Sequence, residues 1–258
     1  MSGIFLGRLF LVHTRKTDNT MKDLQPLSFE QHKTFGYTEK YGSEYGHQVG
    51  AVMILPNEFA KAQREYPILF RKDSETGRFL PVVLLGFEEH ENLFLNESAT
   101  WGARYIPLAV RQGPFLIGLQ QQEAEQRLAI YADLNDSRIQ QNATPALFNA
   151  DGNASATLNE IREILSARHK GSESLEPMIE AFLKYNLLER VILEIGLSHG
   201  ATIKFDAGYT VHIENLMALE NDAVVALHKS GFLSLAYNVA DSVNNIQRLI
   251  DIKNAKMK

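Results

Sequence analysis

Four side chains that lie close together in the sequence could form a binding surface: Trp101, Arg104, Tyr105 and Arg111. Tryptophan and tyrosine offer large, rigid contact areas with one polar group each, and arginine offers a planar fork that suits carboxylates, phosphates and aromatic faces. The competing interpretation is that the aromatic rings cover the core beneath a loop, since Pro107 lies among them. Packing of the loop over the core is the favoured interpretation, and the four residues are our candidates for a binding surface.

The densest polar cluster, Glu88-Glu89-His90-Glu91, contains the oxygen and imidazole groups that bind divalent metals. Successive side chains on a strand point to opposite faces, however, and runs of charged residues usually face water. The cluster therefore favours a solvated turn over a set of metal ligands. We predict no metal site from the histidines, which show no HxxxH or HxH spacing: His13, His32, His47, His90, His169, His199, His212 and His228.

Motifs for nucleophilic or nucleotide chemistry are missing from the sequence. The serines lie in no GxSxG elbow, so an α/β-hydrolase nucleophile is unsupported. Neither GxGxxG nor GxxxxGK[ST] is present to hold a phosphate. The absence of cysteine excludes disulfides, thiolate nucleophiles and Cys-ligated zinc or iron–sulfur sites. The sequence predicts no cofactor and no catalytic residue, and it leaves open whether the chain is an enzyme.

Charge and hydropathy narrow the range of partners. The 258 residues carry a formal charge of −5, which gives no global attraction for nucleic acid or for an anionic membrane. No stretch approaches the roughly 18 to 20 apolar residues that span a bilayer. The apolar segment Gly3–Val12 is interrupted by Arg8 and has no small-residue cleavage site after it, unlike a signal peptide. We expect a cytoplasmic protein in which residues 1–20 form a loosely ordered extension.

The elements that must position these side chains follow two patterns, and the first half favours strands. Short runs rich in Val, Ile, Leu and Phe alternate with Gly, Pro and Asp, and one short helix is expected at Glu58–Arg64 after Asn57 as its N-cap. The segment 72–77 ends in Gly77 and predicts a hairpin turn. The predicted strands are Val49–Leu55, Pro67–Arg71, Phe79–Gly86, Asn92–Leu95, Pro114–Leu119 and Arg127–Tyr131.

The second half favours helices, because apolar residues recur there at helical spacing. One helix is expected to begin at Ser155 or Thr157 and to end at Gly171, and the next to begin near Ser172 or Ser174. Two later helices are expected at Asn221–Leu227 and Phe232–Ile252. Between these pairs of helices we expect the strands Arg190–Leu197 and Ala201–Phe205, joined at His199-Gly200, and a third strand at Tyr209–Ile213.

This order of elements predicts an α+β fold, with an antiparallel strand-rich N-terminal half packed with a helix-rich C-terminal half. The length suits one domain with a substantial core. We expect a single domain over residues 21–258, divided, if at all, into lobes 21–145 and 146–258.

Several separately spaced segments of the sequence match the blocks of one known family. The segment Tyr66–Phe79 has the sequence YPILFRKDSETGRF and resembles the hallmark segment of the SapC family of bacterial proteins. The resemblance covers about Leu24 to the C-terminus, so the predicted domain is SapC-like. Further segments follow in the family's order: Glu91–Leu95; the spaced set Trp101, Tyr105, Pro107, Arg111, Pro114 and Phe115; Ala146–Phe148 with Asp151-Gly152 and Ser155; and Gly208–Thr210.

The resemblance implies an accessory or binding protein without an evident catalytic motif. Many members of the family look like companions of tryptophan-halogenase-like flavoproteins and cupin-type proteins, which implies a flavin-dependent halogenase-like or cupin-type protein partner, or a modified small molecule as ligand. Two alternatives stay open. The chain could be an enzyme that acts on an amino-acid or peptide substrate near Trp101 and Arg111, or a structural component of a bacterial surface layer, from which the family takes its name.

Overall fold

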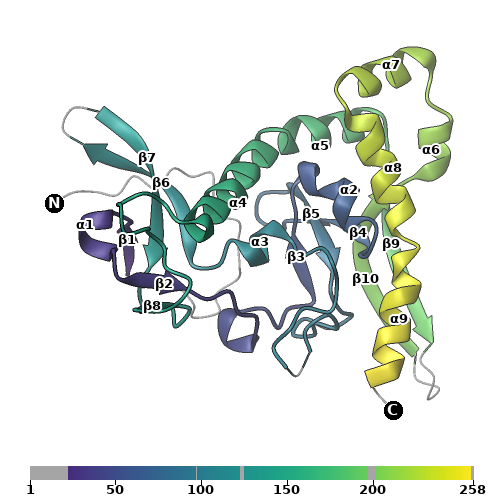
Figure 1. Cartoon of the computed structure of the whole chain (residues 1–258). Coiled ribbons are helices and arrows are strands. Elements are labelled where there is room, and N and C mark those ends of the chain that lie inside the picture. The colour runs from purple at the N-terminus through teal and green to yellow at the C-terminus, as the bar shows by residue number, and fades with distance from the viewer. Residues whose placement is uncertain (1–22, 97, 123–124, 197–201, 257–258) are drawn as a thin grey trace. The chain divides into compact units, whose positions relative to one another are not determined.

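The computed structural model describes residues 23–96, 98–122, 125–196 and 202–256 (Figure 1). The predicted extension at residues 1–20 lies outside these ranges. Contacts divide the chain into two compact units, and each unit is made of two separated stretches: one of residues up to 40 with 111–167, the other of 41–110 with 168–258. The predicted single domain, with lobes at 21–145 and 146–258, stays a prediction.

The first unit contains two small antiparallel sheets. A three-stranded sheet has the order β1-β7-β6, and a two-stranded sheet pairs β2 with β8. Tyr37 and Phe115 meet edge to face in the core of this unit, with ring centroids 4.9 Å apart. The elements are β1 (Leu24–Pro26), α1 (Phe29–His32), β2 (Phe35–Tyr37), β6 (Phe115–Gln122), β7 (Glu125–Asp133) and β8 (Ile139–Gln141).

The second unit is built on a five-stranded antiparallel sheet with the order β3-β5-β4-β10-β9. Strands from early and late in the chain meet in this sheet where Tyr209 of β10 pairs with Phe70 of β4. The strands are β3 (Ala51–Met53), β4 (Ile68–Lys72), β5 (Phe79–Leu84), β9 (Leu188–Gly196) and β10 (Thr202–Val211).

Helices pack with this sheet around a core rich in phenylalanine. Phe70 lies between Phe59 and Phe182, with ring centroids 6.4 and 6.1 Å away. The helical elements of this unit are η1 (Ser43–Tyr45), η2 (Pro56–Glu58), α2 (Phe59–Ala62), α5 (Leu175–Lys184), α6 (Ile213–Met217), α7 (Asn221–Lys229), α8 (Phe232–Ser242) and α9 (Asn245–Lys256), while α3 (Leu108–Arg111) and α4 (Ala156–Glu173) cross the unit boundaries.

The predicted α+β class is confirmed: antiparallel sheets come mostly from the first half, and the longer helices from the second. The predicted hairpin is also present, since β4 and β5 pair from Ile68 to Lys72. Asp73 accepts hydrogen bonds from the Thr76 amide and hydroxyl, and Gly77 adopts a φ of 69° in the left-handed region. The turn residues therefore act locally, as the sequence indicated.

The predicted strand Asn92–Leu95 is wrong, because hydrogen bonds of the buried Asn92 side chain take the place of strand pairing there. The side-chain NH2 group of Asn92 donates to the His47 carbonyl at 2.7 Å, and its side-chain oxygen accepts from the Phe94 backbone amide at 3.0 Å. Local side-chain hydrogen bonds of this kind compete with strand pairing. The segment is a turn that inserts Leu93 and Phe94 into the core.

The predicted helix Phe232–Ile252 is two helices, α8 and α9, separated by Val243 and Asn244. The buried Ser242 hydroxyl accepts from the Ile68 backbone amide at 2.8 Å, and the side-chain NH2 group of Asn245 donates to the Gln63 carbonyl at 2.7 Å. These tertiary hydrogen bonds hold both ends of the break.

Other boundaries also differ from prediction, among them those at Asn57, at Gly171 and at Tyr209–Ile213. Asn57, the predicted N-cap, lies inside η2. Gly171 lies inside α4 and does not end it. Its lack of a Cβ lets the helix pass very close to Leu55 and Asn57. The predicted third strand at Tyr209–Ile213 is mostly the end of β10, which continues through a bulge between Asp206 and Gly208. The predicted joint at His199-Gly200 lies outside the described residues.

Candidate functional site

Trp101 is partly buried and packs against the core of the second unit. Its indole N–H donates to the Tyr66 hydroxyl at 2.8 Å, and the Tyr66 hydroxyl donates to the Tyr105 carbonyl. Tyr66 is fully buried, and burial raises the pKa of its hydroxyl. Part of the predicted surface is therefore bonded directly to the core.

Glu65 fixes the backbone of the same loop. Its carboxylate accepts from the Arg104 amide at 3.0 Å and from the Tyr105 amide at 2.8 Å, and the Arg248 guanidinium lies 3.4 Å from it. The Arg104 side chain is exposed, and among the described residues no side chain pairs with its guanidinium. The loop therefore presents Arg104 to solvent from a fixed backbone.

Tyr105 turns its side chain inward to a buried carboxylate. Glu58, which is 1% exposed, accepts from the Tyr105 hydroxyl, the Leu108 amide and the Leu55 amide, each at 2.8 Å. Burial raises the pKa of Glu58, although these hydrogen bonds and the Arg168 guanidinium act in the opposite direction. Among the described residues, two buried nitrogens of Arg168, Nε and Nη1, have no hydrogen-bond partner. Tyr105 therefore contributes to holding the loop in place.

Arg111 belongs to the other compact unit. Its guanidinium forms an ion pair with Glu160, and its Nε lies 3.9 Å from Glu39. Three of the four predicted residues are thus in one unit, and Arg111 has its own partners in the other. A joint role for all four stays a prediction.

An aromatic cluster that the sequence did not single out adjoins Trp101. The Tyr41 ring lies 5.8 Å from the Trp101 ring and 5.7 Å from His47, and Tyr45 lies 6.0 Å from His47, all between ring centroids. Tyr41 and Tyr45 are partly buried, and His47 is buried. The spacing of three aromatic rings within seven residues was the available signal, but only tertiary contact connects them to Trp101.

The acidic cluster at residues 88–91 forms a turn, as predicted. Lys253 Nζ lies 2.7 Å from Glu88 and 2.8 Å from Glu91, and the Lys253 side chain is 8% exposed. A lysine therefore neutralises two of these carboxylates, which agrees with a structural role.

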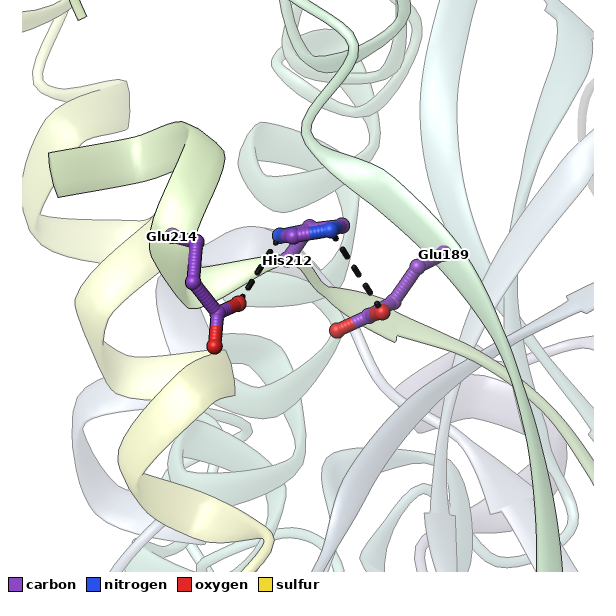
Figure 2. A group of neighbouring side chains, drawn as sticks. All are labelled: Glu189, His212 and Glu214. Carbon is purple, nitrogen blue, oxygen red and sulfur yellow. Dashed lines mark ion pairs between the residues drawn. The ribbon is translucent and has the colours of Figure 1, made fainter. Parts of the chain in front are cut away.

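A different group has the composition of a metal site (Figure 2). His212 directly follows β10, Glu189 lies on β9, and Glu214 is in the first turn of α6. His212 Nε2 is 3.9 Å from Glu189, and His212 Nδ1 is 3.0 Å from Glu214. One ligand atom from each residue lies within 4.8 Å of the other two. His212 Nδ1 also lies 3.3 Å from the Asn215 amide, where it can cap α6.

The sequence missed this group because no short spacing contains it. Pairing of β9 with β10 places Glu189 opposite Thr210 and so brings it close to His212, 23 positions along the chain. A search for histidine pairs could not find one histidine flanked by two glutamates.

Two shallow depressions lie elsewhere. One, of about 350 Å³, is an apolar hollow in the first unit with a single charged group, and the other, of about 540 Å³, lies in the second unit beside α6 and α7. Neither is lined by Trp101, Arg104, Tyr105 or Arg111. The enzyme alternative, which requires a pocket beside Trp101 and Arg111, gains no support from them.

Comparisons with known proteins identify one relationship. The family model described as SapC matches residues 27–249, which is most of the chain. No curated protein and no solved structure matches the chain. Within the described ranges, the helices are too short or too polar to cross a membrane.

Proposed function

The chain belongs to the SapC family, and on this premise we propose that it is a cytoplasmic, non-catalytic accessory protein that binds a protein partner. The proposed recognition surface consists of Arg104, Trp101 and the adjoining Tyr41. One observation carries the proposal. The Glu65 carboxylate accepts hydrogen bonds from the backbone amides of Arg104 and Tyr105, and the Arg104 side chain is exposed and without a partner among the described residues.

A surface of this composition suits protein recognition. Tryptophan, tyrosine and arginine are the side chains that most often dominate binding energy at interfaces. Binding costs less conformational entropy when the backbone is ordered beforehand, as Glu65 orders it here. The exposed guanidinium favours a carboxylate on the partner, because arginine pairs with carboxylates through two parallel hydrogen bonds.

We favour a protein over a modified small molecule as the ligand. Small-molecule sites are concave and largely enclose their ligands. The residues of the proposed surface line neither of the two depressions described above. By family resemblance, the partner to test first is a flavin-dependent halogenase-like protein, followed by a cupin-type protein.

The sequence offers a specific reporter for the test, because Trp101 is its single tryptophan. Incorporation of 5-fluorotryptophan gives one fluorine resonance, and each purified partner is titrated against it. We expect the resonance to shift or broaden at saturation. Arg104→Glu is expected to weaken the interaction about tenfold or more, as for a residue at the centre of an interface.

Arg78→Glu provides the matched control, since Arg78 is also exposed and lies in the hairpin turn. This variant should bind the partner like the wild type. An unchanged Trp101 resonance with both classes of partner, or equal affinities for the two variants, would overturn the proposal. Turnover of substrate by the purified chain alone would contradict its non-catalytic part.

A further inference from the structure

We propose that Glu189, His212 and Glu214 form a binding site for a divalent transition-metal ion, with Zn²⁺ as the reference ion (Figure 2). This site is separate from the proposed recognition surface and does not depend on it. The proposal rests on the contacts of the imidazole, on the absence of a competing lysine or arginine among the described residues and on the scaffold that holds the side chains.

The two nitrogens of His212 face different carboxylates. Nε2 lies 3.9 Å from Glu189, and Nδ1 lies 3.0 Å from Glu214. One imidazole cannot bind the same ion through both nitrogens, so the two carboxylates have different roles. We assign Nε2 and the Glu189 carboxylate as direct ligands, because zinc takes histidine nitrogen and carboxylate oxygen at about 2.0–2.2 Å each. An ion between two atoms 3.9 Å apart meets that requirement with little movement.

Glu214 then orients the imidazole. A histidine that binds a metal through one nitrogen commonly donates its other N–H to a carboxylate, which fixes the ring and makes it a better ligand. Glu214 lies at hydrogen-bond distance from Nδ1. Binding of the ion at Nε2 requires the tautomer with the proton on Nδ1, so in the metal-bound state Nδ1 donates to Glu214 and no longer accepts from the Asn215 amide. Its side chain is 76% exposed, and its oxygen is within 4.8 Å of the other two ligand atoms, so it can also move toward the ion.

Within the described ranges, no lysine or arginine neutralises these carboxylates. Among residues in the described part of the chain, neither Glu189 nor Glu214 forms an ion pair with a lysine or arginine. The contrast with Glu88 and Glu91 is direct, since Lys253 contacts both of those. Two uncompensated carboxylates beside an imidazole attract a divalent cation, and the mixed nitrogen and oxygen set favours Zn²⁺ over Mg²⁺.

The backbone beneath the site is well fixed. Glu189 pairs with Thr210 across β9 and β10, and the His212 amide donates to the Leu187 carbonyl at 2.8 Å. Sites on regular elements hold their ligands more accurately than sites on free loops. Glu189 and His212 therefore face each other without a folding transition.

The test is isothermal titration of Zn²⁺ alone into the full chain, after removal of metals, in a non-chelating buffer at neutral pH. We expect one ion per chain at this site, with Mg²⁺ unable to compete. His212→Asn is the decisive variant. Asparagine is a favoured N-cap and keeps an acceptor for the Asn215 amide, but it removes the Nε2 ligand. We expect its zinc affinity to fall about tenfold or more, with an unchanged melting temperature in the absence of metal.

Two carboxylate variants separate the assigned roles by their rank. Glu189→Gln should lose affinity as His212→Asn does, and Glu214→Gln should lose less than either of these direct-ligand variants, because removal of an orienting partner costs about 10–100-fold at most. His169→Gln is the matched control, because His169 also lies near a carboxylate, 3.8 Å from Glu173. It should bind zinc like the wild type.

The result that would overturn the proposal is the same zinc affinity in the wild type and in both His212→Asn and Glu189→Gln, or no binding by the wild type. Arg104→Glu should keep its zinc affinity. Loss of partner binding by that variant is therefore distinguishable from loss of the metal site.

Discussion

The indole N–H of Trp101 donates to the hydroxyl of Tyr66 at 2.8 Å. Tyr66 is fully buried, so a polar group of the core fixes the side chain of a residue in the proposed recognition surface. The same hydroxyl donates to the Tyr105 carbonyl. One core hydroxyl thus satisfies polar groups at both ends of the segment 101–105.

Replacing Tyr66 with phenylalanine should separate that segment from the core. Tyr66→Phe leaves the Trp101 N–H and the Tyr105 carbonyl without their partner, which costs about 1–3 kcal/mol for a buried group. We expect a lower urea midpoint and an altered emission of Trp101. Tyr237→Phe is the control, since Tyr237 is 42% exposed. Equal stability of the two variants would show that the hydroxyl has no such role.

Tyr37 predicts a loss of stability at high pH. Burial raises the pKa of its hydroxyl from 10.0 to about 12, with Arg138 acting in the opposite direction. Between these values the folded chain holds a proton that the unfolded chain has lost, so the stabilising contribution is complete below pH 10 and disappears as the pH rises to about 12.

Urea unfolding across this range measures the effect, with the tyrosinate absorbance followed in parallel. Tyr37→Phe should flatten the pH dependence, because phenylalanine cannot ionise. If the slope with pH is the same in the variant and in the wild type, ionisation of Tyr37 does not contribute.

Gly171 sets helix propensity against packing. Alanine is favoured over glycine within a helix by about 1 kcal/mol. A Cβ at residue 171 would lie 2.2 Å from the Asn57 side-chain oxygen and 2.8 Å from the Leu55 Cβ, however, and overpacking of this kind costs about 1–3 kcal/mol. Packing should therefore prevail.

We expect Gly171→Ala to lower the melting temperature despite the better helix former. Gly171→Ala combined with Asn57→Ala removes the closest obstacle and should recover part of the loss. A single variant more stable than the wild type would contradict the close approach.

Short-range signals predicted the parts of the fold that short-range contacts determine. The β4–β5 hairpin followed from Asp73 and Gly77, whose roles are local. The α+β class followed from apolar periodicity. The break before Asn245 could not be predicted in this way, because its amide bonds to Gln63, more than 180 positions away. Gly171 was mistaken for a helix end because a close tertiary approach and a C-cap require the same residue type.

In the candidate sites, too, residue type could be read from the sequence and tertiary contacts could not. Residue type alone indicated Trp101 and Arg104, but the hydrogen bonds of Glu65 to that loop join residues about 40 positions apart. His212 was compared only with the other histidines, because strand pairing is what brings Glu189 near it.

The interleaved composition of the two compact units has a consequence for synthesis. When residues up to 110 have emerged from the ribosome, neither unit has all of its strands: β2 still lacks β8, and β4 lacks β10. The unit that ends at residue 167 can fold first, whereas the segment 41–110 can complete its sheet only after the C-terminal third is translated. During that interval β4 has an unpaired edge, and an unpaired strand edge can join another chain. Nascent chains should therefore depend on chaperones most strongly before β10 is translated.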